Sequence, residues 1–464
     1  MSALPDTLNA NKLSAALRYI DAWIDYNFQD ARIPALSVAV QHGAALVYSR
    51  ACGLADVDGL VALTTDHTFR IASHSKTFTA VAVLQLRDAD KLRLDDKVGA
   101  HLPWFHSSVD ARVGAVTVRQ LLNHTAGVIR DGEDSDYWQA LRGFPHEEEL
   151  KAYIGQSRLI YNTDERFKYS NFGYAYLGLL IEAVAGTPYR QYVSDAIIKP
   201  LGLASTGADL DRHAEETLAR GYGVELFNRK RKLYGHIDTH ALSAATGFYA
   251  SATDACRYFA AQFYGHEVLL SDASKREMQH SYWQPEGGKN KYGLGMIGHE
   301  KKGWTLYGHS GGFPGYITES RFDPTRQLAV TVLTNASDGP AEKIIGALIN
   351  IVDTFQLAAE QTDDQSVRLQ QFAGRYYSSR GATDIVLVGD KLLAIAPSAW
   401  ADFEEAEELT PTGDKTLTIE KAGGYASPGE MVRYNFDGAG QVESVVKAGS
   451  SLYPFEKAEA LGLF

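Results

Sequence analysis

The sequence predicts a mixed α/β (α+β) domain built on an antiparallel sheet, followed by a small antiparallel β-barrel. Strand-like runs occur near the start of the chain and return after residue 300, whereas the segment from about 69 to 270 is mostly helical. The composition changes near residue 356, where a polar stretch precedes short alternating runs. This order favours a sheet whose strands come from both ends of one domain, with a helical insertion between them.

A helix and a hairpin are the first predicted elements. Apolar residues recur at helical spacing over 11–28, which indicates an amphipathic helix. The runs 36–40 and 44–48 alternate like strands, and the intervening His42-Gly43 is a hairpin signal. Within the helical segment, the clearest helical patterns are 117–123 and 174–185.

Strand patterns return in the last part of the first domain, which we place at residues 1–355. Gly-rich or Asp-Pro turns separate three of them, and apolar residues between 345 and 352 then mark one face of a closing helix. The three predicted strands are 304–307, 316–322 and 328–333.

The remaining chain reads as a linker and a second domain. Residues 356–366 are polar, so we expect a cut there to leave a soluble N-terminal domain. Short strands with turn residues between them predict an antiparallel barrel over 367–464. Its clearest strands are 384–388, 392–396 and 432–436.

Composition narrows the classes of function. The hydrophobic fraction of 45% over 464 residues predicts a sizeable core, and the net charge of −12 argues against nucleic acid as a partner. The basic run 228–232 reads as a solvated turn. Two cysteines, Cys52 and Cys256, are too few for a disulfide framework and fit a reducing compartment.

The sequence shows neither a leader nor a membrane span. The first residues lack a basic and an apolar region, and no run approaches the ~18 apolar residues of a spanning helix. We therefore expect a cytoplasmic protein without a membrane partner. A leader encoded ahead of this sequence would instead make it periplasmic. The oligomeric state stays open.

The stretch 69–86 places a serine and a lysine ahead of apolar residues. Ser73 and Lys76 stand three apart, so both side chains share one face if a helix starts there. Apolar residues behind the lysine would desolvate it, lower its pKa and let it act as base for a weak nucleophile. The backbone N–H of Ser73 would then point toward an oxyanion.

The same SxxK pattern occurs a second time, at Ser444 and Lys447. This copy lies in a strand-like alternation, where the two side chains would face opposite sides of the sheet. We interpret it as coincidental. On its own, the first copy also fits a helix cap at Ser73 followed by a surface lysine at Lys76. The neighbouring sequence motifs must therefore decide between a cap and a catalytic pair.

Five segments, found in order over about residues 15–355, resemble those of the serine β-lactamase and penicillin-binding-protein superfamily. The resemblance is to its branch of class C β-lactamases, D-aminopeptidases, alkaline D-peptidases and related esterases. FRIASHSKTFTA resembles the first motif, LLNHTAG the LLxHTSG signature, FKYSNFGY the YxN motif and GHSGG the HxG form of the third motif. The segments are 69–80, 91–96, 121–127, 167–174 and 308–312.

The resemblance implies a β-lactamase/DD-peptidase-like fold and an acyl-enzyme mechanism. Ser73 would be the nucleophile, and Lys76 and Tyr169 would move the proton, with Lys76 lowering the pKa of Tyr169. The implied substrate-binding residues are Asn171, His309, Gly311 and Gly312, and Gly312 would supply the second oxyanion N–H. No metal or organic cofactor is implied. His236 and His240 lack a third ligand for a metal.

His309 departs from the lactamase pattern, which has a lysine at this position to attract a carboxylate. A histidine of ordinary pKa is mostly neutral near pH 7. This favours a substrate with a free amine or an ester end, and the acidic loop 131–136 would hold a cationic amine. That loop fits a solvated surface turn as well.

We therefore expect a serine hydrolase acting on small amides or peptides, with tolerance for D-amino acids. The barrel supports this expectation because it resembles the lipocalin-like domains appended to D-aminopeptidases. The alternatives are a carboxylesterase or weak β-lactamase on the same scaffold, and a non-catalytic penicillin-binding-like sensor. A short peptide or other small molecule is the expected partner.

Overall fold

The structure is a computed structural model that describes residues 7–227, 229–284, 290–360, 363–401, 403–423 and 427–464. The chain forms two compact units, which are Ile33–Ile345 and the combination of Met1–Arg32 with Gly346–Phe464. Within the described residues, every helix is too short or too polar to cross a lipid bilayer.

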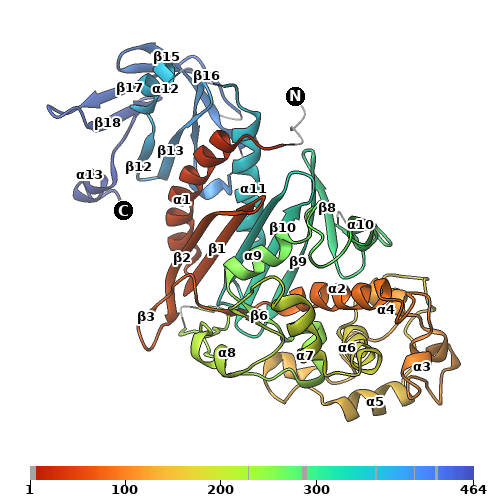
Figure 1. The fold of residues 1–464 in the computed structure, drawn as a ribbon. Coiled ribbons are helices and arrows are strands. Elements are labelled where there is room, and N and C mark those ends of the chain that lie inside the picture. Colours follow the sequence, from red (N-terminus) through yellow and green to blue (C-terminus); the bar gives the residue numbers. More distant parts are fainter. Residues whose placement is uncertain (1–6, 228, 285–289, 361–362, 402, 424–426) are drawn as a thin grey trace. The chain divides into compact units, whose positions relative to one another are not determined.

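The first unit is organised around an eight-stranded sheet in the order β3-β2-β1-β11-β10-β9-β8-β7 (Figure 1). β1 pairs antiparallel with its hairpin partner β2 and with β11, with Val38 opposite Val332. Strands from the two ends of the unit therefore meet in the middle of the sheet, as the sequence predicted. The strands are β1 Ala35–His42, β2 Ala45–Asp56, β3 Val61–Ala62, β7 Asn290–Tyr292, β8 Ile297–Lys301, β9 Trp304–Phe313, β10 Tyr316–Asp323 and β11 Leu328–Thr334.

β9 is longer than predicted. The sequence placed its end at residue 307 because the following Gly-rich stretch reads as a turn, but the strand continues to Phe313. Pairing with β10 carries it through, with Gly312 opposite Ile317. On its other side the described register with β8 ends at Gly308. The last residues of β9 therefore pair with β10 beyond the end of their register with β8.

Helices fill the segment between β3 and β7. α9 packs against β1, β10 and β11 on one face of the sheet (Figure 1), and α2 packs against α6. A small sheet joins β4 Phe69–Arg70, β6 Tyr249–Ala250 and β5 Thr206–Gly207. The helices are α2 Ser75–Asp88, α3 Val98–His101, α4 Val118–Leu122, α5 Glu147–Gln156, α6 Asn171–Ala185, α7 Tyr189–Val193, α8 Arg212–Thr217, α9 Ala252–Ala260 and α10 Asp272–Gln279.

The second unit contains the C-terminal sheet, a nearly closed antiparallel barrel of eight strands in sequence order. Tyr377 and Tyr453 exchange backbone hydrogen bonds of 2.7 and 2.9 Å between its first and last parts. The strands are β12 Gly374–Ser378, β13 Gly381–Val388, β14 Lys391–Ile395, β15 Glu407–Gly413, β16 Thr416–Lys421, β17 Met431–Phe436, β18 Val442–Lys447 and β19 Ser450–Leu452.

The N-terminal helix α1 Ala10–Ala31 belongs to the same unit as the barrel and contacts it directly. The indole of Trp23 donates to the carbonyl of Pro397 at 3.1 Å, and the hydroxyl of Tyr19 donates to Asp384 at 3.0 Å. Asp384 also pairs with Arg375 at 2.6 Å. These contacts combine segments that the sequence assigned to different domains.

Helices reach into both sides of the expected linker 356–366. α11 Ala341–Leu357 begins in one unit and ends in the other, and α12 is Asp363–Gln370. Residues 361–362 lie outside the described residues.

Candidate active site

Ser73 lies in a tight turn that leads into α2. A 3₁₀ turn covers Ala72–His74 and α2 begins at Ser75. Ala72 has φ of 50°, a left-handed conformation that costs a residue with a Cβ of the order of 1–2 kcal/mol. Such strain is typical of functional sites. Ser73 is partly exposed while both of its neighbours are buried.

Lys76 is fully buried, and its side-chain nitrogen Nζ faces three oxygens. Nζ lies 3.2 Å from Ser73 Oγ, 2.7 Å from Asn171 Oδ1 and 2.8 Å from the carbonyl oxygen of Ala245. Burial holds the pKa of Lys76 well below its usual range, although the nearby Asp131 opposes the shift. The predicted contact between Lys76 and Ser73 is therefore present.

Tyr169 approaches Ser73 from another side. Its hydroxyl donates to Ser73 Oγ at 3.0 Å, and Lys76 Nζ lies 4.8 Å from its ring centroid. Burial raises the pKa of Tyr169 above its ordinary value, outweighing the hydrogen bond to Ser73 and the charge of Arg130. The expectation that Lys76 would lower this pKa is wrong because desolvation of the phenol dominates, so the group is a neutral phenol.

Asn171 begins α6 and links Lys76 to the loop after the LLNHTAG segment. Its Oδ1 accepts from Lys76, while its Nδ2 donates to Asp131 Oδ1 at 2.7 Å. Asp131 also accepts from the hydroxyl of Tyr137 at 3.2 Å and is buried. The sequence identified Asn171 but did not predict that Asp131 orients its amide.

The acidic loop 131–136 does not present a cluster of unpaired carboxylates. Asp131 accepts from Asn171 and Tyr137. Asp134 pairs with Arg142 at 2.9 Å, and Asp136 accepts from Gln139 at 2.7 Å. These three carboxylates therefore already have partners in the protein, whereas Glu133, the fourth carboxylate of the loop, is exposed. The site for a cationic amine stays a prediction.

His309 is buried and both of its ring nitrogens face protein atoms. Nδ1 lies 2.7 Å from the carbonyl of Ser310, so it carries the proton, and Nε2 accepts from the hydroxyl of Tyr292 at 3.2 Å. That hydroxyl in turn accepts from His124 Nε2 at 3.1 Å. Burial, with Lys76 adding to it, holds the pKa of His309 well below its usual range. Its ring is thus neutral and held by Tyr292.

Gly311 and Gly312 occupy alternate faces of β9. A Cβ on Gly311 would collide with the carbonyl of Ile71 and with Thr318 Oγ1, whereas the nearest atom to a Cβ on Gly312 is Ile317 Cδ1 at 3.8 Å. Gly311 therefore lets β9 pack against the turn that carries Ser73. Gly312 is exposed.

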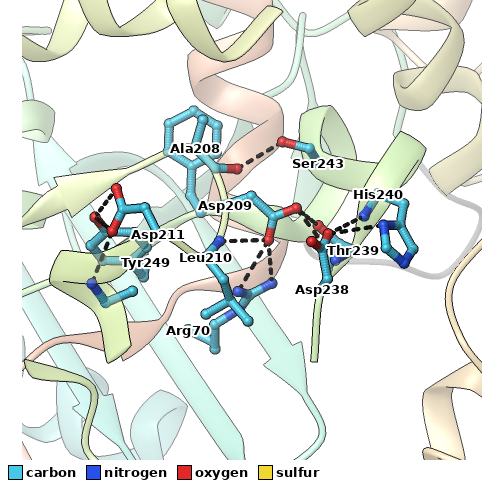
Figure 2. Close-up of polar contacts among 12 residues, drawn as sticks. Arg70, Ala208, Asp209, Leu210, Asp211, Asp238, Thr239, His240, Ser243 and Tyr249 are labelled. Atoms are coloured by element: carbon cyan, nitrogen blue, oxygen red, sulfur yellow. Dashed lines mark hydrogen bonds and ion pairs between the residues drawn. The ribbon is translucent and has the colours of Figure 1, made fainter. Parts of the chain in front are cut away.

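The buried carboxylate of Asp209 connects Arg70 to Thr239 (Figure 2). Arg70 precedes Ser73 in the chain, and Thr239 precedes Ala245. Asp209 Oδ1 accepts from Arg70, three residues before Ser73, at 3.2 Å, and Asp209 Oδ2 accepts from Thr239 Oγ1 at 2.7 Å and from Arg190 at 2.9 Å. Burial raises the pKa of Asp209 while the two arginines oppose the shift. No motif in the sequence marks Asp209 or Ala245. Asp209 pairs with arginines that are distant in the chain, and Ala245 contributes only its backbone carbonyl oxygen.

Residues of the other predicted features lie in different surroundings. Ser444 accepts from Asn435 at 2.9 Å, and Lys447 pairs with Glu407 at 2.6 Å, both on the barrel. Of the basic run 228–232, residue 228 lies outside the described residues, and Lys230 pairs with Asp58 at 2.7 Å. The described residues contain no group of three or more potential metal ligands.

A comparison with models of known protein families identifies the family of this chain. A family model described as Beta-lactamase matches residues 20–352. Among curated proteins, protein flp of Staphylococcus aureus (strain MW2) is 30% identical over 206 residues, which are 44% of this chain. The chain spans only 41% of the length of that relative.

Solved structures show a similar fold. The octameric penicillin-binding protein homologue from Pyrococcus abyssi superposes with a TM-score of 0.60 at 21% identity, covering 94% of this chain and 100% of its own. A D-stereospecific amidohydrolase from Streptomyces sp. gives a TM-score of 0.61 at 24% identity, covering 72% and 97%. Identities this low establish likeness of fold alone.

Proposed function

The chain belongs to the beta-lactamase family of hydrolases, and from this premise we propose that it is a serine hydrolase working through an acyl-enzyme on Ser73. The observation that carries the proposal is the convergence of Lys76 Nζ and the hydroxyl of Tyr169 on one serine oxygen, at 3.2 and 3.0 Å. A hydroxyl needs a base within hydrogen-bond reach to attack a carbonyl at neutral pH.

Lys76 is the general base. A neutral amine has two N–H groups and one lone pair, and the two shortest contacts of Nζ are to acceptors, Asn171 Oδ1 and the carbonyl of Ala245. Donation to those two oxygens leaves the lone pair for the proton of Ser73. Burial supports the neutral form because it lowers the pKa of Lys76.

During the reaction, protons move among Ser73, Lys76, Tyr169 and the leaving group. Ser73 Oγ bonds to the substrate carbonyl carbon as its proton moves to Lys76. Tyr169 gives its proton to the leaving nitrogen or oxygen and regains one from Lys76, so that the bond to the leaving group breaks and an acyl-enzyme remains. Water adds to the acyl carbon, and the proton it loses returns to Ser73. The backbone N–H groups of Ser73 and Gly312 stabilise the oxyanion in both halves.

Small amides or peptides, including those with D-amino acids, are the proposed substrates. The buried neutral His309 disfavours the lactamase alternative, because it supplies no permanent charge at the position where lactamases have lysine. Ester hydrolysis is the second candidate. A neutral phenol as proton donor serves an alkoxide leaving group as well as an amine.

A serine-reactive probe tests the proposal. We expect a fluorophosphonate to label the wild-type protein once, at Ser73, and Ser73→Ala to abolish both labelling and hydrolysis of D-aminoacyl anilides and short acyl esters. Ser444→Ala is the matched control and should behave as wild type, since its serine lies in a strand of the barrel. Failure of the wild type to be labelled would favour the sensor alternative.

A further inference from the structure

A cavity of about 330 Å³ lies beside α10, and its described lining residues include none from the five motif segments. Arg276 and Gln279 of α10 line it together with Tyr264, which follows α9. Residues of β7, β8 and β9 complete its wall, and β8 lies next to α10 (Figure 1). Pockets of about 300–1,000 Å³ hold small organic molecules. The cavity therefore has the size of a ligand site apart from the site around Ser73.

Gln279 brings an unsatisfied amide to this cavity. The residue ends α10 and is 6% exposed. Its Oε1 accepts from the hydroxyl of Tyr264 at 2.7 Å, whereas its Nε2 has no hydrogen-bond partner among the described residues. A buried donor without a partner destabilises a fold, and such groups are rare in native proteins. An occupant of the cavity that Gln279 lines can supply the missing acceptor.

Arg276 brings a positive charge to the same wall. It lies one turn before Gln279, so both side chains share one face of α10. Its guanidinium carbon lies 4.6 Å from the ring centroid of Tyr264, which thus contacts both residues. The carboxylate of Asp272 is 3.9 Å from the guanidinium, too far for a hydrogen bond, and the arginine side chain is 60% exposed. Its planar array of N–H donors is therefore open to a ligand.

The other charges of the cavity wall balance each other. Lys291 on β7 pairs with Glu300 on β8 at 2.6 Å. Arg276 thus supplies the net charge of the wall, and Gln279 adds neutral donors beside it. A guanidinium and an amide NH₂ group are both pure donors, and the groups that match them are negatively charged oxygens.

We propose that this cavity binds a small organic oxyanion, and that Arg276 and Gln279 hold its charged group. A phosphate monoester and a carboxylate share this chemistry, because both present charged oxygens that accept several hydrogen bonds. Such a group satisfies the Nε2 of Gln279 and the guanidinium of Arg276 together. The inference goes beyond the proposed hydrolase function and does not depend on it, since Ser73, Lys76 and Tyr169 lie outside the described wall of the cavity.

Isothermal titration calorimetry on the full chain tests the inference with glycerol 2-phosphate, glutarate and glycerol. We expect saturable binding of an anion and none of glycerol, which lacks the charge. Tighter binding of glycerol 2-phosphate would identify a phosphate site, and tighter binding of glutarate a carboxylate site. Arg276→Gln should weaken the binding at least about tenfold, as the loss of one charge-assisted hydrogen bond does. Arg276→Lys should retain part of the affinity because it keeps the charge.

Gln279→Met separates the role of the amide from that of the charge. Methionine keeps an unbranched side chain of similar length without the N–H donors, so we expect weaker anion binding than in wild type.

Arg257→Gln is the matched control. This arginine of α9 is 48% exposed and lies 3.7 Å from Asp254, much as Arg276 lies near Asp272, but it is not part of the described wall. The variant should bind the anion as wild type does. Failure of both anions to bind, or wild-type affinity in Arg276→Gln, would overturn the inference. Labelling of Ser73 by a fluorophosphonate reports on the proposed hydrolase separately and should be the same in Arg276→Gln and wild type.

Discussion

At the scale of single residues, burial decides the protonation states of the site. Lys76, Tyr169 and His309 are each held in the neutral form, since desolvation is the largest cause of the pKa shift in every case. A neutral lysine has a free lone pair and can accept the serine proton, which an ammonium cannot. The exposed Arg130 stands outside this buried centre, where its Nε pairs with Asp131 at 3.1 Å.

The two glycines of the third motif should differ sharply in their tolerance of a methyl group. Gly311→Ala should destabilise the fold by about 2 kcal/mol or more, because the new Cβ meets the carbonyl of Ile71 and Thr318 Oγ1 and neither can move freely. Gly312→Ala should change the free energy of unfolding by less than about 0.5 kcal/mol, since its nearest neighbour is at 3.8 Å. Chemical denaturation of both variants checks this. Equal losses would contradict the assigned faces of β9.

Single residues were predictable where a motif carries the chemistry in its side chain. Ser73, Lys76, Tyr169 and Asn171 were all identified from the sequence, and the structure brings them together. The carbonyl of Ala245 could not be predicted, because any residue type supplies the same backbone oxygen. The neutral state of His309 was expected, but its partner Tyr292 could not be predicted, since the fold brings the two side chains together from different strands.

At the scale of elements, the turn that carries Ser73 is held by a charge pair that local sequence does not mark. Arg70 and Asp209 are both buried, and Asp209 also holds Thr239, which precedes the segment containing Ala245 (Figure 2). One carboxylate thus connects the nucleophile's turn with the segment that supplies an acceptor for Lys76. Burial costs both charges, as the raised pKa of Asp209 and the lowered pKa of Arg70 indicate.

Removing one partner of this pair should therefore be costly. Asp209→Asn leaves the buried guanidinium of Arg70 without its counter-charge, and we expect a loss of about 3–5 kcal/mol in the free energy of unfolding. Asp238→Asn is the control, because its side chain is 42% exposed and its ion pairs should contribute less than about 1 kcal/mol. Urea denaturation of the two variants compares them. If both losses were small, Arg70 would have another way to be neutralised.

Elements were predicted well where hydrophobic periodicity was strong, as in α1, α6 and the hairpin of β1 and β2. The predicted end of β9 came too early in the chain, because the glycines at 308, 311 and 312 are typical of a turn. In the folded protein, pairing with β10 and the close approach of the Ile71 carbonyl make glycine suitable within a strand. Tertiary contacts of this kind leave no trace in local pattern.

At the scale of the whole molecule, the chain order does not match the compact units. α1 lies hundreds of residues from the barrel in sequence, yet both belong to one unit. Its Trp23 donates to Pro397, and its ring meets Trp400 edge-on with centroids 5.9 Å apart. The polar stretch after residue 356 predicted a boundary from composition, but composition carries no information on which distant helix the barrel binds.

Cutting the chain after Ala358 should therefore expose apolar surface, in contrast to the soluble domain that the linker predicted. The cut removes Pro397, Trp400 and Asp384, which are the barrel contacts of Trp23 and Tyr19 on α1. Burying one aromatic side chain stabilises a fold by roughly 1.5–3 kcal/mol, so two exposed rings amount to a large fraction of the stability of a domain. We expect the shortened protein to aggregate or to bind the dye ANS, measured beside the full chain.

The same shortened protein with Trp23→Ser and Tyr19→Ser should be more soluble, because the exposed surface is then polar. A shortened protein that stays soluble, binds no dye and melts at the temperature of the full chain would show that the barrel does not protect α1.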